Sequence, residues 1–134
     1  MSECVLDADV VIAALDRRDS HHAAAARLLR RMAADRTRML LSLVNYAEVL
    51  VRPAADPETL RSAVDAIAAL RLELVAPTGP ISRHVARLRN TGVSLPDGFA
   101  LATAGARGSS FATFDQSARN AARAAGIQLA PTMR

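Results

Sequence analysis

The chain has no lysine, no tryptophan and a single cysteine, Cys4, among its 134 residues. One cysteine cannot form a disulfide within the chain, and its place in an apolar run predicts a small buried residue. Aromatic residues make up only 3% of the chain, and all lie in apolar surroundings: Tyr46, Phe99, Phe111 and Phe114. We therefore expect no stacking platform for single-stranded bases, which argues against RNA-recognition and cold-shock folds.

Long apolar runs are missing as well. No stretch approaches the roughly 20 apolar residues that a helix needs to cross a bilayer. Residues 1–7 have neither a basic n-region nor a long apolar h-region, so we expect no signal peptide. Together these absences predict a cytoplasmic protein without a membrane partner.

Small apolar residues and arginine dominate what is present. The length suits one domain with a real core, so residues 1–134 are predicted to form a single domain. Apolar residues make up 51%, which excludes a disordered chain. The net charge is +4, because 17 arginines outnumber 13 acids. GC-rich coding can account for arginine in place of lysine, but the net basicity still suits a polyanionic substrate.

Short apolar strands alternate with helices along the chain. We expect strands at 3–6, 39–41, 72–75, 110–113 and 127–129. Helices are expected at 8–15, 21–34 with Ser20 as N-cap, 43–51, 57–70, 80–92, 96–108 and 115–125. This alternation predicts an α/β fold with a central parallel β-sheet of four or five short strands and helices on both faces.

Four acidic residues stand where apolar chain has little use for a charge: Asp7, Glu48, Asp97 and Asp115. A carboxylate beside buried apolar chain is costly unless a cation compensates it. Asp7 and Asp115 each follow a predicted strand, and Asp97 begins a predicted helix. Because the carboxyl ends of parallel strands meet at one edge of a sheet, we expect these three side chains to converge there.

Glu48 can reach the same edge through the phase of its helix. At about 100° per residue, one arc of that helix is apolar and is expected to face the core: Leu43, Val44, Ala47, Leu50 and Val51. Glu48 lies about 40° beyond this arc, so it can point along the sheet edge. Without lysine, the compensating cation must be an arginine or an ion from solution such as Mg²⁺.

Each acid also has a purely structural interpretation. Asp7, Asp97 and Asp115 are good N-caps, and Glu48 can pair with an arginine. A catalytically silent binding module is therefore one competing hypothesis. A small phosphatase is another, since Asp7-Ala8-Asp9 after a strand resembles the nucleophile loop of haloacid-dehalogenase-type phosphatases. The absence of lysine argues against that loop and against a receiver domain.

Two hydroxyl residues accompany the acids. Ser42 and Thr113 each end a predicted strand, where a hydroxyl can orient a carboxylate or hold a metal-bound water. Thr113 is the stronger candidate, being two residues before Asp115. No histidine spacing matches a zinc site, so we expect solvent-exposed histidines at positions 21, 22 and 84.

Residues 5–13 (VLDADVVIA), 45–50 (NYAEVL), 95–104 (LPDGFALATA) and 112–115 (ATFD) resemble, in this order, a PIN-domain ribonuclease. The more specific likeness is to the toxin of a VapBC-type toxin–antitoxin pair. The acids are 41, 49 and 18 residues apart, and the resemblance covers nearly the whole chain. It implies a PIN-like fold in which the four acids hold one or two Mg²⁺ or Mn²⁺ ions for the hydrolysis of RNA by activated water.

The resemblance also implies partners. These are a structured RNA such as tRNA or ribosomal RNA, a cognate antitoxin that blocks the acidic site, and a second copy of the chain in a homodimer. The apolar helices at 43–51 and 60–70 would supply the dimer or antitoxin surface. Asp9 stands where the family more often has Ser, Thr or Asn, so it either tightens metal binding or raises a neighbour's pKa by repulsion. Gly98 replaces the commoner alanine and leaves the chemistry untouched.

Overall fold

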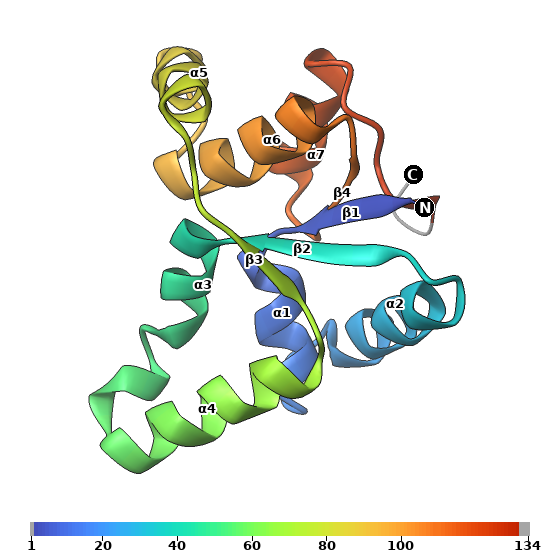
Figure 1. Ribbon diagram of the computed structural model, residues 1–134, viewed down its shortest axis with the longest axis vertical. Coiled ribbons are helices and arrows are strands. Elements are labelled where there is room, and N and C mark those ends of the chain that lie inside the picture. The colour runs from blue at the N-terminus through green and yellow to red at the C-terminus, as the bar shows by residue number, and fades with distance from the viewer. Residues whose placement is uncertain (1, 132–134) are drawn as a thin grey trace.

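The computed structural model describes residues 2–131 as a parallel sheet between two layers of helices (Figure 1). Four strands follow the order β3-β2-β1-β4: β1 (Glu3–Leu6), β2 (Arg38–Ser42), β3 (Glu73–Val75) and β4 (Ser110–Ala112). The helices are α1 (Ala8–Leu15), α2 (His22–Ala34), α3 (Leu43–Leu50), α4 (Pro57–Ala69), α5 (Gly79–Arg89), α6 (Leu95–Arg107) and α7 (Gln116–Ala124), with a 3-10 turn η1 (Pro53–Ala55) before α4. The predicted α/β fold is confirmed.

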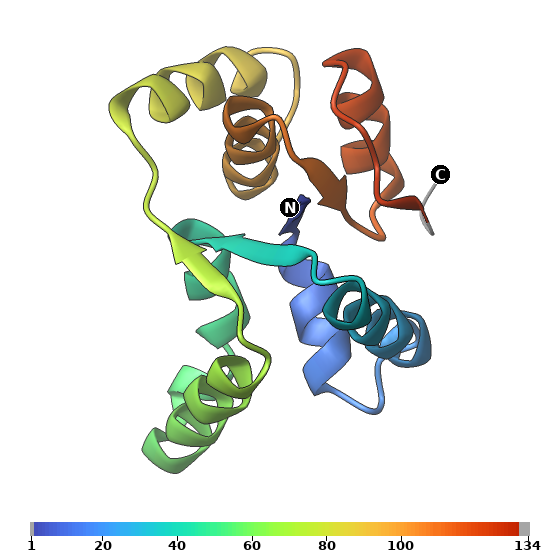
Figure 2. The same ribbon diagram turned by 45° about the vertical axis from the view of Figure 1, so that its right-hand side comes forward.

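The strands bury side chains on both faces of the sheet, which is why their sequences read as continuous apolar runs. Val5 packs with Phe111 in the core beneath α6 and α7, whereas its neighbours Cys4 and Leu6 belong to the core shared with α1 and α2. In Figures 1 and 2 the helices α5 to α7 cover one side of the sheet, and α1, α2 and α4 lie on the other. The protein therefore has one hydrophobic core on each face of the sheet.

Two predicted local features are wrong. Residues 127–129 do not form a strand, because β4 is short and only Phe111 pairs with Leu129 in an isolated bridge. Ser20 does not cap α2. His21 is the N-cap, without a side-chain capping bond, and its own N–H is taken by the Asp19 carboxylate at 2.8 Å. Within residues 2–131, no helix is long and apolar enough to cross a membrane.

The carboxyl edge of the sheet is where the chain leaves each strand for the next helix. Asp7 follows β1, Ser42 ends β2 and Thr113 follows β4. The start of α6 is tied to this edge by the Asn45 amide of α3, which donates to the Pro96 carbonyl oxygen at 3.0 Å. The connections that carry the acidic residues are thus held together by the parallel topology.

Candidate active site

Asp7 is the most buried of the acids, with 4% of its surface exposed. Its backbone N–H donates to the Ala112 carbonyl at 2.9 Å, which links the ends of β1 and β4. One carboxylate oxygen accepts the Ala8 N–H at 2.8 Å as the N-cap of α1, and the other accepts the Thr113 hydroxyl at 2.8 Å. Burial, then repulsion from Asp9 and Asp97, raises the pKa of Asp7 from 3.8 to about 7, although the Thr113 bond opposes the shift.

Asp9 faces Asp7 from the first turn of α1. Its Oδ2 accepts the Phe114 N–H at 3.0 Å and stands 3.3 Å from the Thr113 hydroxyl, which has only one proton to give and is nearer to Asp7. Its Oδ1 is buried and has no hydrogen-bond partner among residues 2–131. Burial is also the main cause of the raised pKa of Asp9. The sequence left two effects open for Asp9, namely tighter metal binding or a raised pKa of a neighbour. Repulsion from Asp9 contributes to the raised pKa of Asp7.

Glu48 is half-buried and held by Asn45, a residue that the sequence analysis missed. The Asn45 amide donates to Glu48 Oε1 at 2.8 Å and to the Pro96 carbonyl at 3.0 Å, so one side chain joins the acid of α3 to the start of α6. Burial raises the pKa of Glu48, and Asp97 adds repulsion. The spacing of Asn45 and Glu48, one helical turn apart, was the available signal for this pair.

The predicted orientation of α3 is wrong. Its buried residues are Asn45 and Val49, whereas Leu43 and Val51 are 41% and 70% exposed. The Asn45 amide points inward and bonds Glu48 and Pro96. Of the predicted apolar arc, Leu43 and Val51 are exposed, while Leu50 is partly buried against the core. Glu48 lies beside the face of α3 that Asn45 and Val49 bury, so its side chain can still reach the carboxyl edge of the sheet.

Asp97 lies in the first turn of α6, whose N-cap is Ser94. Asp97 therefore does not cap this helix, which removes its simplest structural interpretation. Burial raises the pKa of Asp97, the Ser94 side chain opposes the shift, and Asp115 adds repulsion. The next residue, Gly98, allows α5 to approach, since a Cβ there would lie 3.0 Å from Val85 Cγ1.

Asp115 is exposed and serves as the N-cap of α7, where its Oδ2 accepts the Ala118 N–H at 2.9 Å. Its own N–H donates to the Thr113 hydroxyl oxygen at 3.1 Å. Thr113 thus contacts Asp7, Asp9 and Asp115, as a residue that orients carboxylates should. Ser42 does not: its hydroxyl accepts the Val44 N–H at 3.3 Å and caps α3.

Asp7, Asp9, Glu48, Asp97 and Asp115 repel one another electrostatically, and within residues 2–131 none of them forms an ion pair with an arginine. Repulsion links Asp7 with Asp9 and Asp97, Asp97 with Glu48 and Asp115, and Asp9 with Asp115. Across residues 2–131, the ion pairs of the structure involve other carboxylates. Arg119, four residues after Asp115, donates its Nε–H to the Thr113 carbonyl at 3.0 Å instead. The arginine-pair interpretation of Glu48 therefore finds no support.

The chemistry of these donors fits a hard divalent ion, which prefers carboxylate oxygens. In the part of the chain that the structure describes, no three His, Cys, Asp or Glu side chains are gathered closely enough to hold one ion together. That arrangement still suits Mg²⁺, which commonly takes one or two carboxylates and completes its shell with water and phosphate. The buried and unpaired Asp9 Oδ1 is a further oxygen available to an ion or its water.

Comparisons with known proteins agree with this fold. A family model described as PIN domain matches residues 4–124. VapBC2 from Rickettsia felis, solved with a DNA fragment from its promoter, is similar with 17% identity, 96% of this chain and 97% of that chain covered, and a TM-score of 0.71. VapBC from Salmonella typhimurium, also solved with DNA, has 21% identity, coverage of 97% and 98%, and a TM-score of 0.73.

A third similar structure is VapC20 from Mycobacterium tuberculosis, described as a toxin that cleaves the sarcin–ricin loop. It shares 15% identity, covers 88% of this chain and 94% of its own, and has a TM-score of 0.70. No curated protein sequence matches the chain. At such identities the solved structures show a common fold.

Proposed function

The chain belongs to the PIN domain family, and from this premise we propose that it is a metal-dependent endoribonuclease acting as the toxin of a toxin–antitoxin pair. The observation that supports this function best is the group of mutually repelling carboxylates at one sheet edge, with no arginine paired to them in residues 2–131. Family membership bears out the resemblance of the four sequence segments to PIN domains.

We propose that Asp7, Glu48, Asp97 and Asp115 hold Mg²⁺ or Mn²⁺. When bound, such an ion supplies a water of lowered pKa and stabilises the charge that develops on a phosphate. The protein's own part is to fix the acids. The Thr113 hydroxyl orients Asp7, and the Asn45 amide orients Glu48 against the start of α6. Asp9 adds negative charge beside Asp7 and so strengthens the attraction for a cation.

RNA is the proposed substrate because the chain as a whole is basic. The 17 arginines exceed the 13 acids, which favours attraction of a polyanion. Arg119 is fixed through its Nε–H beside Thr113, and its remaining N–H groups can bind a phosphate of the RNA. A structured target such as tRNA or ribosomal RNA is favoured by the similar VapC20, which is described as cleaving the sarcin–ricin loop.

An antitoxin and a second copy of the chain are the proposed protein partners. A similar structure from Klebsiella pneumoniae is described as a toxin–antitoxin complex. The exposed part of the apolar arc of α3 offers a surface for such a partner, since Leu43 and Val51 are 41% and 70% exposed. Val64 of α4 is 36% exposed and extends the apolar surface of this pair of helices.

The decisive experiment uses purified protein, free of antitoxin, with structured RNA and Mg²⁺ or Mn²⁺. We expect specific cleavage that a chelator stops and that Asp97→Asn reduces by roughly 100-fold or more, because residues supporting a metal already account for about 10- to 100-fold. Glu3→Gln is the matched control, since it neutralises a carboxylate at the opposite edge of the sheet. Equal activity of wild type and Asp97→Asn would refute the assignment.

The catalytically silent binding module remains a second candidate because of specific observations. Asp7 and Asp115 both cap helices, and no three acids are gathered around one point within residues 2–131. Calorimetry with Mg²⁺ or Mn²⁺ separates the two functions. The nuclease predicts saturable metal binding that is weakened in Glu48→Gln, whereas the silent module predicts none.

A further inference from the structure

The imidazole of His21 lies flat against the ring of Phe114. The ring centroids are 4.3 Å apart and the planes differ by 6°, which is a stacked arrangement. No local pattern in the sequence predicts this pair, because His21 precedes α2 and Phe114 follows β4.

The stack is built onto the candidate active site. The Phe114 N–H donates to Asp9 Oδ2 at 3.0 Å, and the residues on either side of Phe114 in the chain are Thr113 and Asp115. Thr113 donates its hydroxyl to Asp7 at 2.8 Å. A ring resting on Phe114 is thus held at the rim of the carboxylates.

His21 is also held in place from its own side. Its N–H donates to the Asp19 carboxylate at 2.8 Å, and the ring of the next residue, His22, bonds the Ala13 carbonyl of α1 at 2.7 Å. The His21 side chain remains 53% exposed while one face rests on Phe114, so its other face is open to solvent. The pair presents a pre-positioned aromatic surface, with the Asp19 carboxylate 3.8 Å from the ring nitrogen as its charged neighbour.

We propose that the open face of His21 stacks a nucleobase of the RNA and so positions the phosphodiester over the carboxylates. Bases stack on aromatic rings whatever their sequence, because every base has a π-face. The stack of two rings would become a stack of three with the base outermost. This role makes His21 a positioning residue. It rests on the proposed function for its substrate, while the aromatic surface itself is independent of catalysis.

The first test is equilibrium binding of a short single-stranded oligoadenylate in the presence of a chelator, which prevents cleavage. We expect His21→Ala to weaken binding by roughly five- to tenfold, the low end of what one stacked base contributes. His21→Tyr should restore affinity and His21→Leu should not, because only the first has an aromatic face. Ser20→Ala, an exposed change in the same turn, should bind like wild type. Equal affinity of His21→Ala and wild type overturns the proposal.

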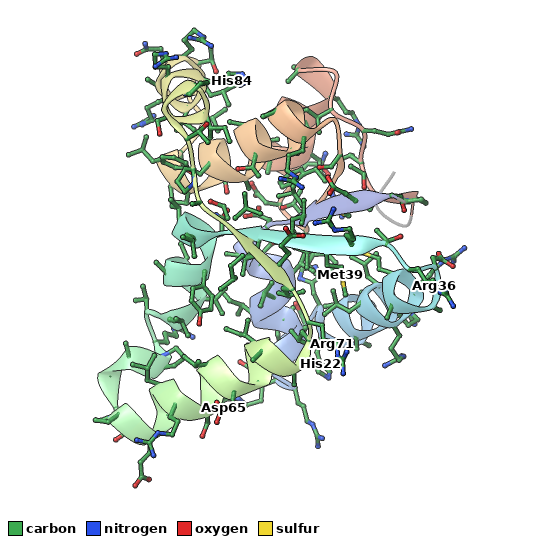
Figure 3. All side chains as sticks on the ribbon, in the orientation of Figure 1. His22, Arg36, Met39, Asp65, Arg71 and His84 are labelled. Atoms are coloured by element: carbon green, nitrogen blue, oxygen red, sulfur yellow. The ribbon has the colours of Figure 1, made fainter. Side chains whose placement is uncertain are left out.

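The second test follows the imidazole C–H signals of His21 by NMR. Stacked oligoadenylate should move them upfield, whereas ribose 5-phosphate, which lacks a base, should leave them in place. His84, which lies on α5 across the sheet from His22, provides a reference histidine in the same spectrum (Figure 3). If the chemical shifts of His21 do not change when oligoadenylate is added, the proposal is also overturned.

The two proposals fail separately. If wild-type protein cleaves RNA but His21→Ala binds and cleaves as well as wild type, the platform is refuted and the nuclease stands. If wild-type protein does not cleave RNA but the His21 signals shift with oligoadenylate, the platform stands and the nuclease is refuted. For an active enzyme, loss of the platform should raise KM more than it lowers kcat, since stacking is made equally in the ground and transition states.

Discussion

The two edges of the sheet hold carboxylates in opposite electrostatic settings. At the amino edge, Glu3 accepts Nε–H and Nη2–H of Arg107 at 3.1 and 2.9 Å and Nη1–H of Arg38 at 2.9 Å. The Arg107 hydrogen bond is the main cause of the lowered pKa of Glu3. At the carboxyl edge, burial raises the pKa of Asp7 to about 7 and no arginine is paired with it in the described residues.

This difference separates a structural carboxylate from a functional one. The chain has 17 arginines, yet within residues 2–131 the fold places two on Glu3 and none on Asp7. A fold selected only for stability would gain by compensating the buried acid first, since an unpaired buried charge costs far more than an exposed one. The uncompensated edge therefore points to a ligand that supplies the positive charge.

The largest expected effect comes from Asp7→Asn, which removes the uncompensated buried charge and with it the difference between the two edges. A folded-state pKa of about 7 against an ordinary 3.8 means that the native state holds a proton longer than the unfolded chain. Stability from this group is full below pH 3.8 and is lost as the pH rises through about 7. The loss is on the order of 4 kcal/mol at most, which Asp7→Asn should recover at pH 8.

Urea denaturation across this pH range, with a chelator present, measures the effect. Asparagine can still accept the Ala8 N–H, and the Thr113 hydroxyl can rotate to accept from its amide, so the bonds around position 7 persist. The variant should match wild type at the acid end of the range and exceed it at the alkaline end. Parallel curves for the two proteins would mean that Asp7 carries no burial penalty.

The sequence predicted the sheet and three acids at its edge because these follow from local rules. Apolar runs mark parallel strands, and strand ends share an edge whatever packs around them. Capping was likewise predictable where an acid follows a strand directly, as for Asp7. The Ser20 cap failed because the carboxylate of Asp19 already holds the turn.

The rest of the site depends on contacts between distant segments. The apolar arc of α3 was expected to be its buried face. The buried face instead contains Asn45, whose amide donates to the carbonyl oxygen of Pro96, a residue far along the chain. The stack of His21 on Phe114 likewise joins the α1–α2 turn to the end of β4. The hydropathy of a helix face shows how apolar that face is, but it does not predict which polar group of a distant segment will form a hydrogen bond with it.

An intermediate effect sharpens the comparison by removing the Thr113 hydroxyl, which contacts three acidic residues of the carboxyl edge. Thr113→Val deletes the donor to Asp7 and Asp9 and the acceptor for the Asp115 N–H. We expect a loss of about 1–3 kcal/mol in the free energy of unfolding, because buried groups lose partners. RNA cleavage should fall roughly 10- to 100-fold.

Thr113→Ser is the matched control, since it keeps the hydroxyl and loses only a methyl group. The pH titration of Asp7 gives a further readout. Its pKa should rise in Thr113→Val, because the hydrogen bond from Thr113 opposes the effect of burial. A valine variant with an unchanged Asp7 titration would show that the hydroxyl does not orient this acid.

The smallest effect belongs to the amino edge. Glu3→Gln removes the shared partner of Arg38 and Arg107, but Arg38 keeps its ion pair with Glu73. We expect a slight fall in melting temperature at low salt that disappears at high salt, because partly exposed ion pairs are screened. The loss should also begin to shrink as the pH falls below the ordinary Glu pKa of 4.5 and should disappear once the pH has fallen through the lowered pKa of Glu3, since the pairing stabilises the fold only while Glu3 is charged. RNA cleavage should not change. A marked loss of cleavage in Glu3→Gln would show that the two edges are coupled and that the arginines at Glu3 serve the active site as well as the fold.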